Sequence, residues 1–124
     1  KYNNLKEVDT EGSVNALKSV NGKIKLANGN TPKGAPLNYV LLNENGSMRL
    51  VFGEGHSYLS LGKNVEYAGE IKFTNSGNIS FLNNRSGHYL PDFNDSEGKN
   101  NVLNTMKSRF GIDLDISIFQ EYKN

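Results

Sequence analysis

The sequence contains no cysteine and no tryptophan, and only three of its 124 residues are proline. The absence of cysteine excludes disulfide bonds, thiolate nucleophiles and cysteine-ligated zinc sites. No apolar stretch approaches the roughly 20 residues that cross a bilayer as a helix, so no membrane-spanning segment is expected. The chemistry of any active site must therefore come from histidine, carboxylate, hydroxyl, lysine or arginine side chains.

The net charge is close to zero, with 14 lysines and arginines against 13 aspartates and glutamates. This balance excludes the large basic excess of proteins that coat nucleic acids non-specifically. The length predicts a single domain over residues 1–124. Within it we expect a mildly basic flank of helix and loop in residues 1–34 and a sheet core in residues 35–124. Because the chain begins with Lys1, we expect a processed piece of a longer polypeptide.

Asparagine–glycine pairs divide the chain into short strand-like runs. Both residues tolerate the left-handed backbone that tight hairpin turns require. A hairpin is predicted about Asn45-Gly46, between strands at residues 39–43 and 47–52. Further strands are predicted at residues 23–26, 57–61, 65–74 and 79–84. Because the connections are too short for helical crossovers, we predict an antiparallel sheet.

Two segments have the periodicity of helices. The first, residues 13–20, places its apolar side chains on one side. The second runs from an N-cap at Asp95 or Ser96 to about Phe110. A last strand is predicted at residues 113–119. Together these elements predict a single-domain α+β fold with a short N-terminal helix, a twisted antiparallel sheet of four to six strands, and one longer helix before the last strand.

Strand alternation gives residues 65–74 one apolar face and one polar face, and Glu70 belongs to the polar face. If residues 62–64 form a three-residue hairpin loop, the strand before them pairs apolar residues with apolar residues. In that register His56 lies directly across from Glu70.

The next hairpin continues the same polar face. A loop at residues 76–78 pairs Phe73 with Phe81 and, if the strand extends, brings His88 to the side that carries Glu70. The two histidines of the protein and one carboxylate are therefore predicted to converge.

Two imidazoles and a carboxylate on one face suit proton transfer near neutral pH. Arg85 can neutralise a phosphate, and the neighbouring Ser86 and Tyr89 can help to hold it. The candidate catalytic residues are His56, Glu70, His88, Arg85, Ser86 and Tyr89. Two other interpretations remain open: a polar face that serves solubility alone, and a His–His–carboxylate metal site. The histidines lack the close spacing of metal ligands, so we predict neither a metal nor a cofactor.

Three short strings in the middle third of the chain resemble a pattern found in C-terminal toxin domains of bacterial polymorphic toxins, which include the contact-dependent growth inhibition and Rhs systems. The strings are Gly55-His56-Ser57, Ala68-Gly69-Glu70-Ile71, and Ser86-Gly87-His88-Tyr89 followed at one remove by Pro91. The resemblance implies an antibacterial toxin domain similar to metal-independent ribonucleases of the barnase, EndoU, colicin and RelE type.

The leading hypothesis is RNA cleavage by 2′-hydroxyl attack on the adjacent phosphate, with tRNA as the expected substrate. His56 or Glu70 would be the base and His88 the acid, although the sequence leaves the assignment between the two histidines open. One alternative is an NAD-consuming toxin, an ADP-ribosyltransferase or NAD glycohydrolase, with Tyr89 stacked on nicotinamide. Another is a non-enzymatic binding module.

The resemblance also implies partners and a location. A cognate immunity protein is expected to bind the domain, tRNA is expected as substrate, and no membrane contact is expected for the isolated domain. The domain would be secreted or displayed on the cell surface as part of a larger protein and would act in the cytoplasm of a target cell.

Overall fold

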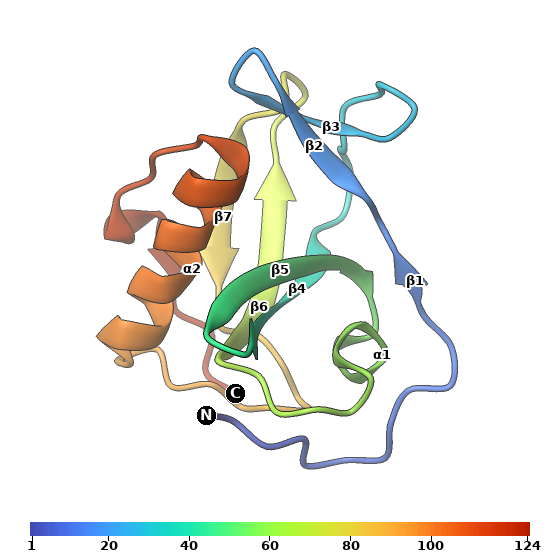
Figure 1. Ribbon diagram of the computed structural model, residues 1–124, viewed down its shortest axis with the longest axis vertical. Coiled ribbons are helices and arrows are strands. Elements are labelled where there is room, and N and C mark those ends of the chain that lie inside the picture. The colour runs from blue at the N-terminus through green and yellow to red at the C-terminus, as the bar shows by residue number, and fades with distance from the viewer.

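A mixed six-stranded sheet forms the centre of the computed structural model, which describes all 124 residues (Figure 1). Its strands lie in the order β1-β5-β4-β6-β7-β8, and a separate two-stranded hairpin, β2–β3, stands beside it. The strands are β1 (Ser13–Val14), β2 (Leu17–Val20), β3 (Lys23–Leu26), β4 (Leu37–Glu44), β5 (Ser47–Glu54), β6 (Tyr67–Phe73), β7 (Ile79–Asn83) and β8 (Phe119–Gln120). The helices are α1 (His56–Ser60), α2 (Ser96–Phe110) and a 3-10 turn, η1 (Ile116–Ile118). The protein is therefore a single α+β domain.

The β4–β5 hairpin confirms the turn predicted at Asn45-Gly46. Both turn residues have positive φ, 55° and 85°, and Glu44 pairs with Ser47 across the turn. An asparagine–glycine pair suits this turn because both residues accept the left-handed backbone.

The helix predicted near residues 95–110 is confirmed as α2. Asp95 is its N-cap and accepts a hydrogen bond from the Gly98 backbone N–H, and Gly111 ends the helix with φ 66°. Its apolar side packs on one face of the sheet, where Val102 and Met106 join a core that includes Tyr67 and Ile71. Figure 1 shows α2 lying along that face. None of the helices combines the length and the apolar character of a membrane-spanning segment.

The opposite face of the sheet carries a second, smaller core. Leu59 of α1 packs there with Val65, Ala68 and Tyr89 against β4 and β5. The alternation predicted for residues 65–74 is confirmed within β6, because Tyr67, Ile71 and Phe73 belong to the first core and Ala68 to the second. The face expected to be polar is therefore covered at Ala68, which is fully buried.

The N-terminal helix predicted at residues 13–20 is wrong. The segment forms β1, paired with β5, and then β2, paired with β3. Asn21 and Gly22, both with positive φ, make the hairpin turn between β2 and β3. A tight turn at this point stabilises strand pairing, and eight residues are too few for a helix that packing does not support.

The strand predicted at residues 57–61 is also wrong, because residues 57–60 belong to α1 and Leu61 is its C-cap. Positive φ values of 82° at Gly55 and 56° at Leu61 bend the chain into and out of this one turn of helix. No hairpin forms about residues 62–64, so the predicted pairing of His56 with Glu70 across a strand ladder does not exist.

Two further register predictions are corrected at the far edge of the sheet. Phe73 pairs with Ile79, and a bulge between Lys72 and Phe73 shifts the ladder so that Phe81 faces Lys72 instead. The predicted last strand is reduced to η1 and β8, and β8 runs parallel to β7. Asp115 diverts the chain by accepting a hydrogen bond from the Ser117 N–H at the start of the 3-10 turn.

Candidate functional site

His56 is the first residue of α1 and lies almost wholly in the interior, with 7% of its surface exposed. Its Nε2 is 2.8 Å from the Gly69 carbonyl oxygen, so Nε2 carries the proton and donates it. Nδ1 then holds the lone pair and has no partner in the protein. Burial lowers the pKa of His56, although the Gly69 carbonyl and the carboxylates of Glu70 and Asp9 partly oppose the shift. The geometry therefore presents a neutral imidazole with a free acceptor nitrogen.

Glu70 projects from β6 toward the same side of the sheet. Its carboxylate accepts a hydrogen bond from Asn83 Nδ2 at 3.1 Å, and its backbone N–H donates to Asn83 Oδ1 at 2.7 Å. The strands come close here, because a Cβ at Gly69 would lie 1.8 Å from the Asn83 carbonyl oxygen. The carboxylate is held in place and partly shielded from water.

His88 lies in the loop after β7, where residues of the N-terminal segment hold both ring nitrogens. Nδ1 is 2.9 Å from Asn4 Oδ1, and Nε2 is 3.3 Å from the Asp9 carboxylate. The Asn4 amide is oriented by its Nδ2, which donates to the Lys6 carbonyl. Both partners of the ring are hydrogen-bond acceptors, so each can receive a bond from a ring N–H.

Asp9 connects α1 to His88, and nothing in the local sequence predicts this role. Its Oδ2 accepts hydrogen bonds from Ser57 Oγ at 2.8 Å and from the Ser57 N–H at 3.2 Å. Gly55 supplies no side-chain cap to α1, so Asp9 caps the helix from a distant part of the chain. Burial opposes ionisation of Asp9, but the Ser57 hydrogen bonds and His88 outweigh it and lower the pKa of this carboxyl.

Two cations, Arg85 and Lys6, lie beside the loop that carries His88. The exposed Arg85 guanidinium is 4.0 Å from Glu70 and lies 4.8 Å above the centre of the Tyr122 ring. Lys6 Nζ lies beside Gly87, where a Cβ would be 3.1 Å from the ammonium, and it makes no hydrogen bond. Both groups keep N–H donors free for an anion such as phosphate.

The side chains of Ser86 and Tyr89 lie in the interior, away from this surface. Tyr89 is 2% exposed, and its hydroxyl is 2.6 Å from Ser60 Oγ and donates to the Lys63 carbonyl. Burial raises the pKa of the Tyr89 phenol. The Ser86 hydroxyl is buried without a partner, while its backbone N–H donates to Asn124 Oδ1. The Tyr89 ring is therefore unable to stack on a bound ligand in this conformation.

Arg85 lies 4.0 Å from Glu70, and Glu70 and His88 both lie near enough to His56 to act on its pKa. His56 arrives from a helix rather than from a paired strand. The N-terminal segment adds Asn4, Lys6 and Asp9, which could not be identified from local pattern. No three histidine, aspartate or glutamate side chains are grouped so that they could hold a metal ion.

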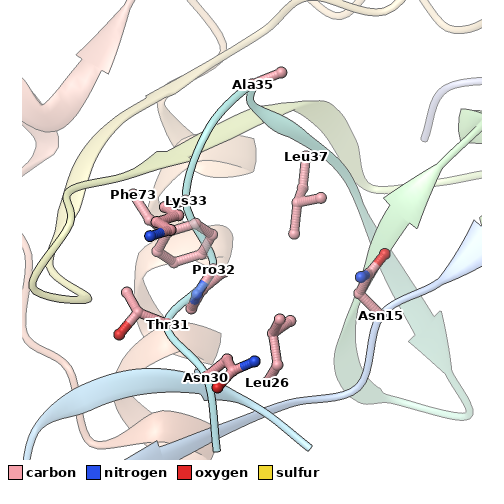
Figure 2. Close-up of a pocket in the computed structure, with 9 residues that line it drawn as sticks. All are labelled: Asn15, Leu26, Asn30, Thr31, Pro32, Lys33, Ala35, Leu37 and Phe73. Atoms are coloured by element: carbon pink, nitrogen blue, oxygen red, sulfur yellow. The ribbon is translucent and has the colours of Figure 1, made fainter. Parts of the chain in front are cut away.

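None of the pockets of the molecule is lined by these four residues. The best-enclosed pocket, of about 460 Å³, lies between the β2–β3 hairpin, the following loop and the sheet. Figure 2 shows its apolar side chains, among them Leu26, Leu37 and Phe73, with Asn15 and Asn30 beside them. The two histidines therefore lie outside every pocket, with His56 buried and His88 partly buried.

Comparison of the chain with protein-family models, with curated protein sequences and with solved structures finds no match.

Proposed function

We propose that this domain is a metal-independent endoribonuclease. The observation that carries the proposal is the unlike surroundings of two histidines that lie near enough for His88 to act on the pKa of His56. His56 has a free acceptor nitrogen and a lowered pKa, whereas His88 has acceptors at both nitrogens. A neutral imidazole and a protonated imidazole are the two groups that general base and general acid catalysis require.

In the proposed reaction His56 Nδ1 takes the proton from a ribose 2′-hydroxyl. The 2′-oxygen forms a bond to the adjacent phosphorus, the bond from phosphorus to the 5′-oxygen breaks, and His88 gives a proton to the leaving oxygen. The proton would come from Nδ1, which contacts the neutral Asn4 amide, while Nε2 stays on the Asp9 carboxylate. The products are a 2′,3′-cyclic phosphate and a free 5′-hydroxyl.

The surrounding charges support each step. Arg85 and Lys6 offer N–H donors to the phosphate oxygens as negative charge develops. Glu70 acts on His56 electrostatically and stabilises the imidazolium that forms when His56 accepts a proton.

The lack of a pocket at the histidines favours RNA over NAD as the substrate. An NAD-consuming enzyme encloses its nicotinamide in a concave site, and the ring assigned to stacking in that alternative, Tyr89, is buried. NAD cleavage is therefore the alternative result in the experiment described below.

The biological setting rests on the sequence resemblance alone. We propose that the domain is delivered as part of a secreted or surface-displayed toxin, acts on tRNA in the cytoplasm of a target cell, and is neutralised by a cognate immunity protein. A producing strain that lacks the adjacent open reading frame and still tolerates full expression of the active domain would contradict the immunity proposal.

The test is to incubate the purified domain with total tRNA and, separately, with NAD, both in the presence of a strong chelator. We expect tRNA fragments that end in a 2′,3′-cyclic phosphate, with no release of nicotinamide. His56→Gln and His88→Ala should each abolish cleavage. Arg49→Ala, which removes an exposed arginine paired with Glu44 in the β4–β5 hairpin, should cleave at the normal rate. Nicotinamide release, intact tRNA, or cleavage that needs an added metal ion would each overturn the proposal.

A further inference from the structure

Tyr122 is the one aromatic residue whose side chain is left exposed. Of the six tyrosines and six phenylalanines, the other eleven are buried or half-buried, whereas Tyr122 keeps 40% of its surface exposed. It belongs to neither hydrophobic core. The fold therefore does not need the ring for packing.

The backbone that carries this ring is nevertheless held firmly. The buried Asn84 side chain accepts a hydrogen bond from the Tyr122 N–H at 2.8 Å and donates one to the Tyr122 carbonyl at 2.9 Å. Asn124 adds a hydrogen bond to the Asn84 carbonyl and accepts one from the Ser86 N–H. These contacts continue the parallel pairing of β8 with β7 beyond Gln120 and fix the tail beside the loop that leads to His88.

The ring adjoins the phosphate-binding cation of the candidate site. The Arg85 guanidinium lies 4.8 Å above the ring centre, and the same guanidinium is 4.0 Å from Glu70. An aromatic ring and a guanidinium plane are the two surfaces on which proteins stack unpaired bases. Arg85 can contribute its plane to a base while its N–H groups reach a phosphate.

We propose that Tyr122 and Arg85 form a subsite for one unpaired base of an RNA strand, next to the phosphate that is cleaved. The inference rests on the proposed ribonuclease function, because it gives a binding site to the base of a nucleotide next to the phosphate that the proposed reaction cleaves. Such a subsite would select single-stranded segments of RNA, since a base inside a duplex is stacked on its neighbours and cannot reach the Tyr122 ring. Tyr122 is a binding residue in this proposal and takes no part in proton transfer.

The test measures binding separately from cleavage. The probe is a short, fluorescently labelled RNA strand with 2′-fluoro sugars, which lack the attacking hydroxyl, used alone or annealed to its complement. We expect the wild-type domain to bind the single strand more tightly than the duplex. Tyr122→Ala should weaken binding of the single strand about tenfold, within the range seen when a base-stacking aromatic is replaced by alanine. Tyr122→Phe, which keeps the ring, should bind like the wild type.

Controls separate the subsite from general effects. Tyr122→Ala retains both backbone hydrogen bonds to Asn84, so its thermal unfolding should match that of the wild type. Arg85→Ala should weaken binding, whereas Arg49→Ala should not. On cleavable RNA, Tyr122→Ala should raise KM and leave the pH dependence of kcat unchanged.

Two sets of results would overturn the inference: Tyr122→Ala binds the strand as well as the wild type, or the wild type binds duplex and single strand equally or neither of them. If binding depends on Tyr122 but the wild type does not cleave RNA, the base subsite stands and the proposed ribonuclease function fails.

Discussion

The contact between Asp9 and α1 predicts a specific loss of stability. Asp9→Ala removes the acceptor of two Ser57 donors and the carboxylate that faces His88. Ser57 is fully buried, so its hydroxyl loses a partner that water does not readily replace. Hydrogen bonds to charged groups contribute about 1.5–3 kcal/mol each. Because the Asp9 side chain remains 28% exposed, we expect a total decrease in unfolding free energy of about 2 kcal/mol.

Chemical denaturation at neutral pH measures this decrease. Asp9→Asn retains an acceptor of similar shape and loses the charge, so we expect about half of the effect. Glu7→Ala is the matched control, because Glu7 is an exposed carboxylate of the same segment and makes no hydrogen bond or ion pair. It should stay within about 0.5 kcal/mol of the wild type.

The pH dependence of the same experiment has a defined sign. Because the folded-state pKa of Asp9 lies below its ordinary value of 3.8, its contribution to stability is present above that pH and is lost as the pH falls through the folded-state value. The difference between wild type and Asp9→Asn should therefore shrink in acid. An Asp9→Ala variant as stable as Glu7→Ala at neutral pH would refute the helix-capping role.

Two further predictions concern the buried parts of the site. The folded-state pKa of His56 lies below its ordinary value of 6.5, so on acidification the unfolded chain takes up a proton at a higher pH than the folded protein does. The stability of the wild type relative to His56→Gln should therefore fall as the pH drops below 6.5. A constant difference in stability between about pH 7 and 5 would contradict the buried neutral imidazole. Gly69→Ala places a Cβ 1.8 Å from the Asn83 carbonyl oxygen and should lower the unfolding free energy by about 3 kcal/mol. In the control Gly46→Ala the space is open, so only the positive φ of this residue destabilises the variant. Equal shifts in melting temperature for the two variants would contradict the close approach of β6 and β7.

Local sequence signals predicted the elements whose cause is itself local. The Asn45-Gly46 turn determines the β4–β5 hairpin, and Asp95 with Gly111 brackets α2. The alternation in β6 also held, because Tyr67 and Ile71 face a core that extends along the strand.

The wrong predictions concern segments whose structure depends on contacts with distant parts of the chain. The five residues of α1 are too few to show a helical period, and the cap of this helix comes from Asp9, which is 48 positions away from Ser57. The segment at residues 13–20 has apolar spacing that fits a helix, but its pairing with β3 and β5 stabilises strands. The parallel pairing of β8 with β7 joins strands that are separated by all of α2.

In the candidate site, too, the sequence predicted only what depends on local signals. His56 and Glu70 were predicted to meet across a strand ladder. The Glu70 carboxylate does act on the pKa of His56, but the predicted strand register is wrong. Asn4, Lys6 and Asp9 come from a polar segment without periodicity, and only the folded chain brings them to His88.

The central claim is that His56 and His88 are the base and the acid of RNA cleavage. Single-turnover cleavage of tRNA by the wild type, His56→Gln and His88→Ala tests it directly, with near-ultraviolet circular dichroism to check that each variant is folded. We expect each substitution to reduce the rate by about 10²-fold or more, as is usual for general acid–base groups. The wild-type rate should show a limb below pH 6.5, where His56 takes up a proton, and this limb should disappear in His56→Gln. A folded variant of either histidine that cleaves at the wild-type rate would contradict the account.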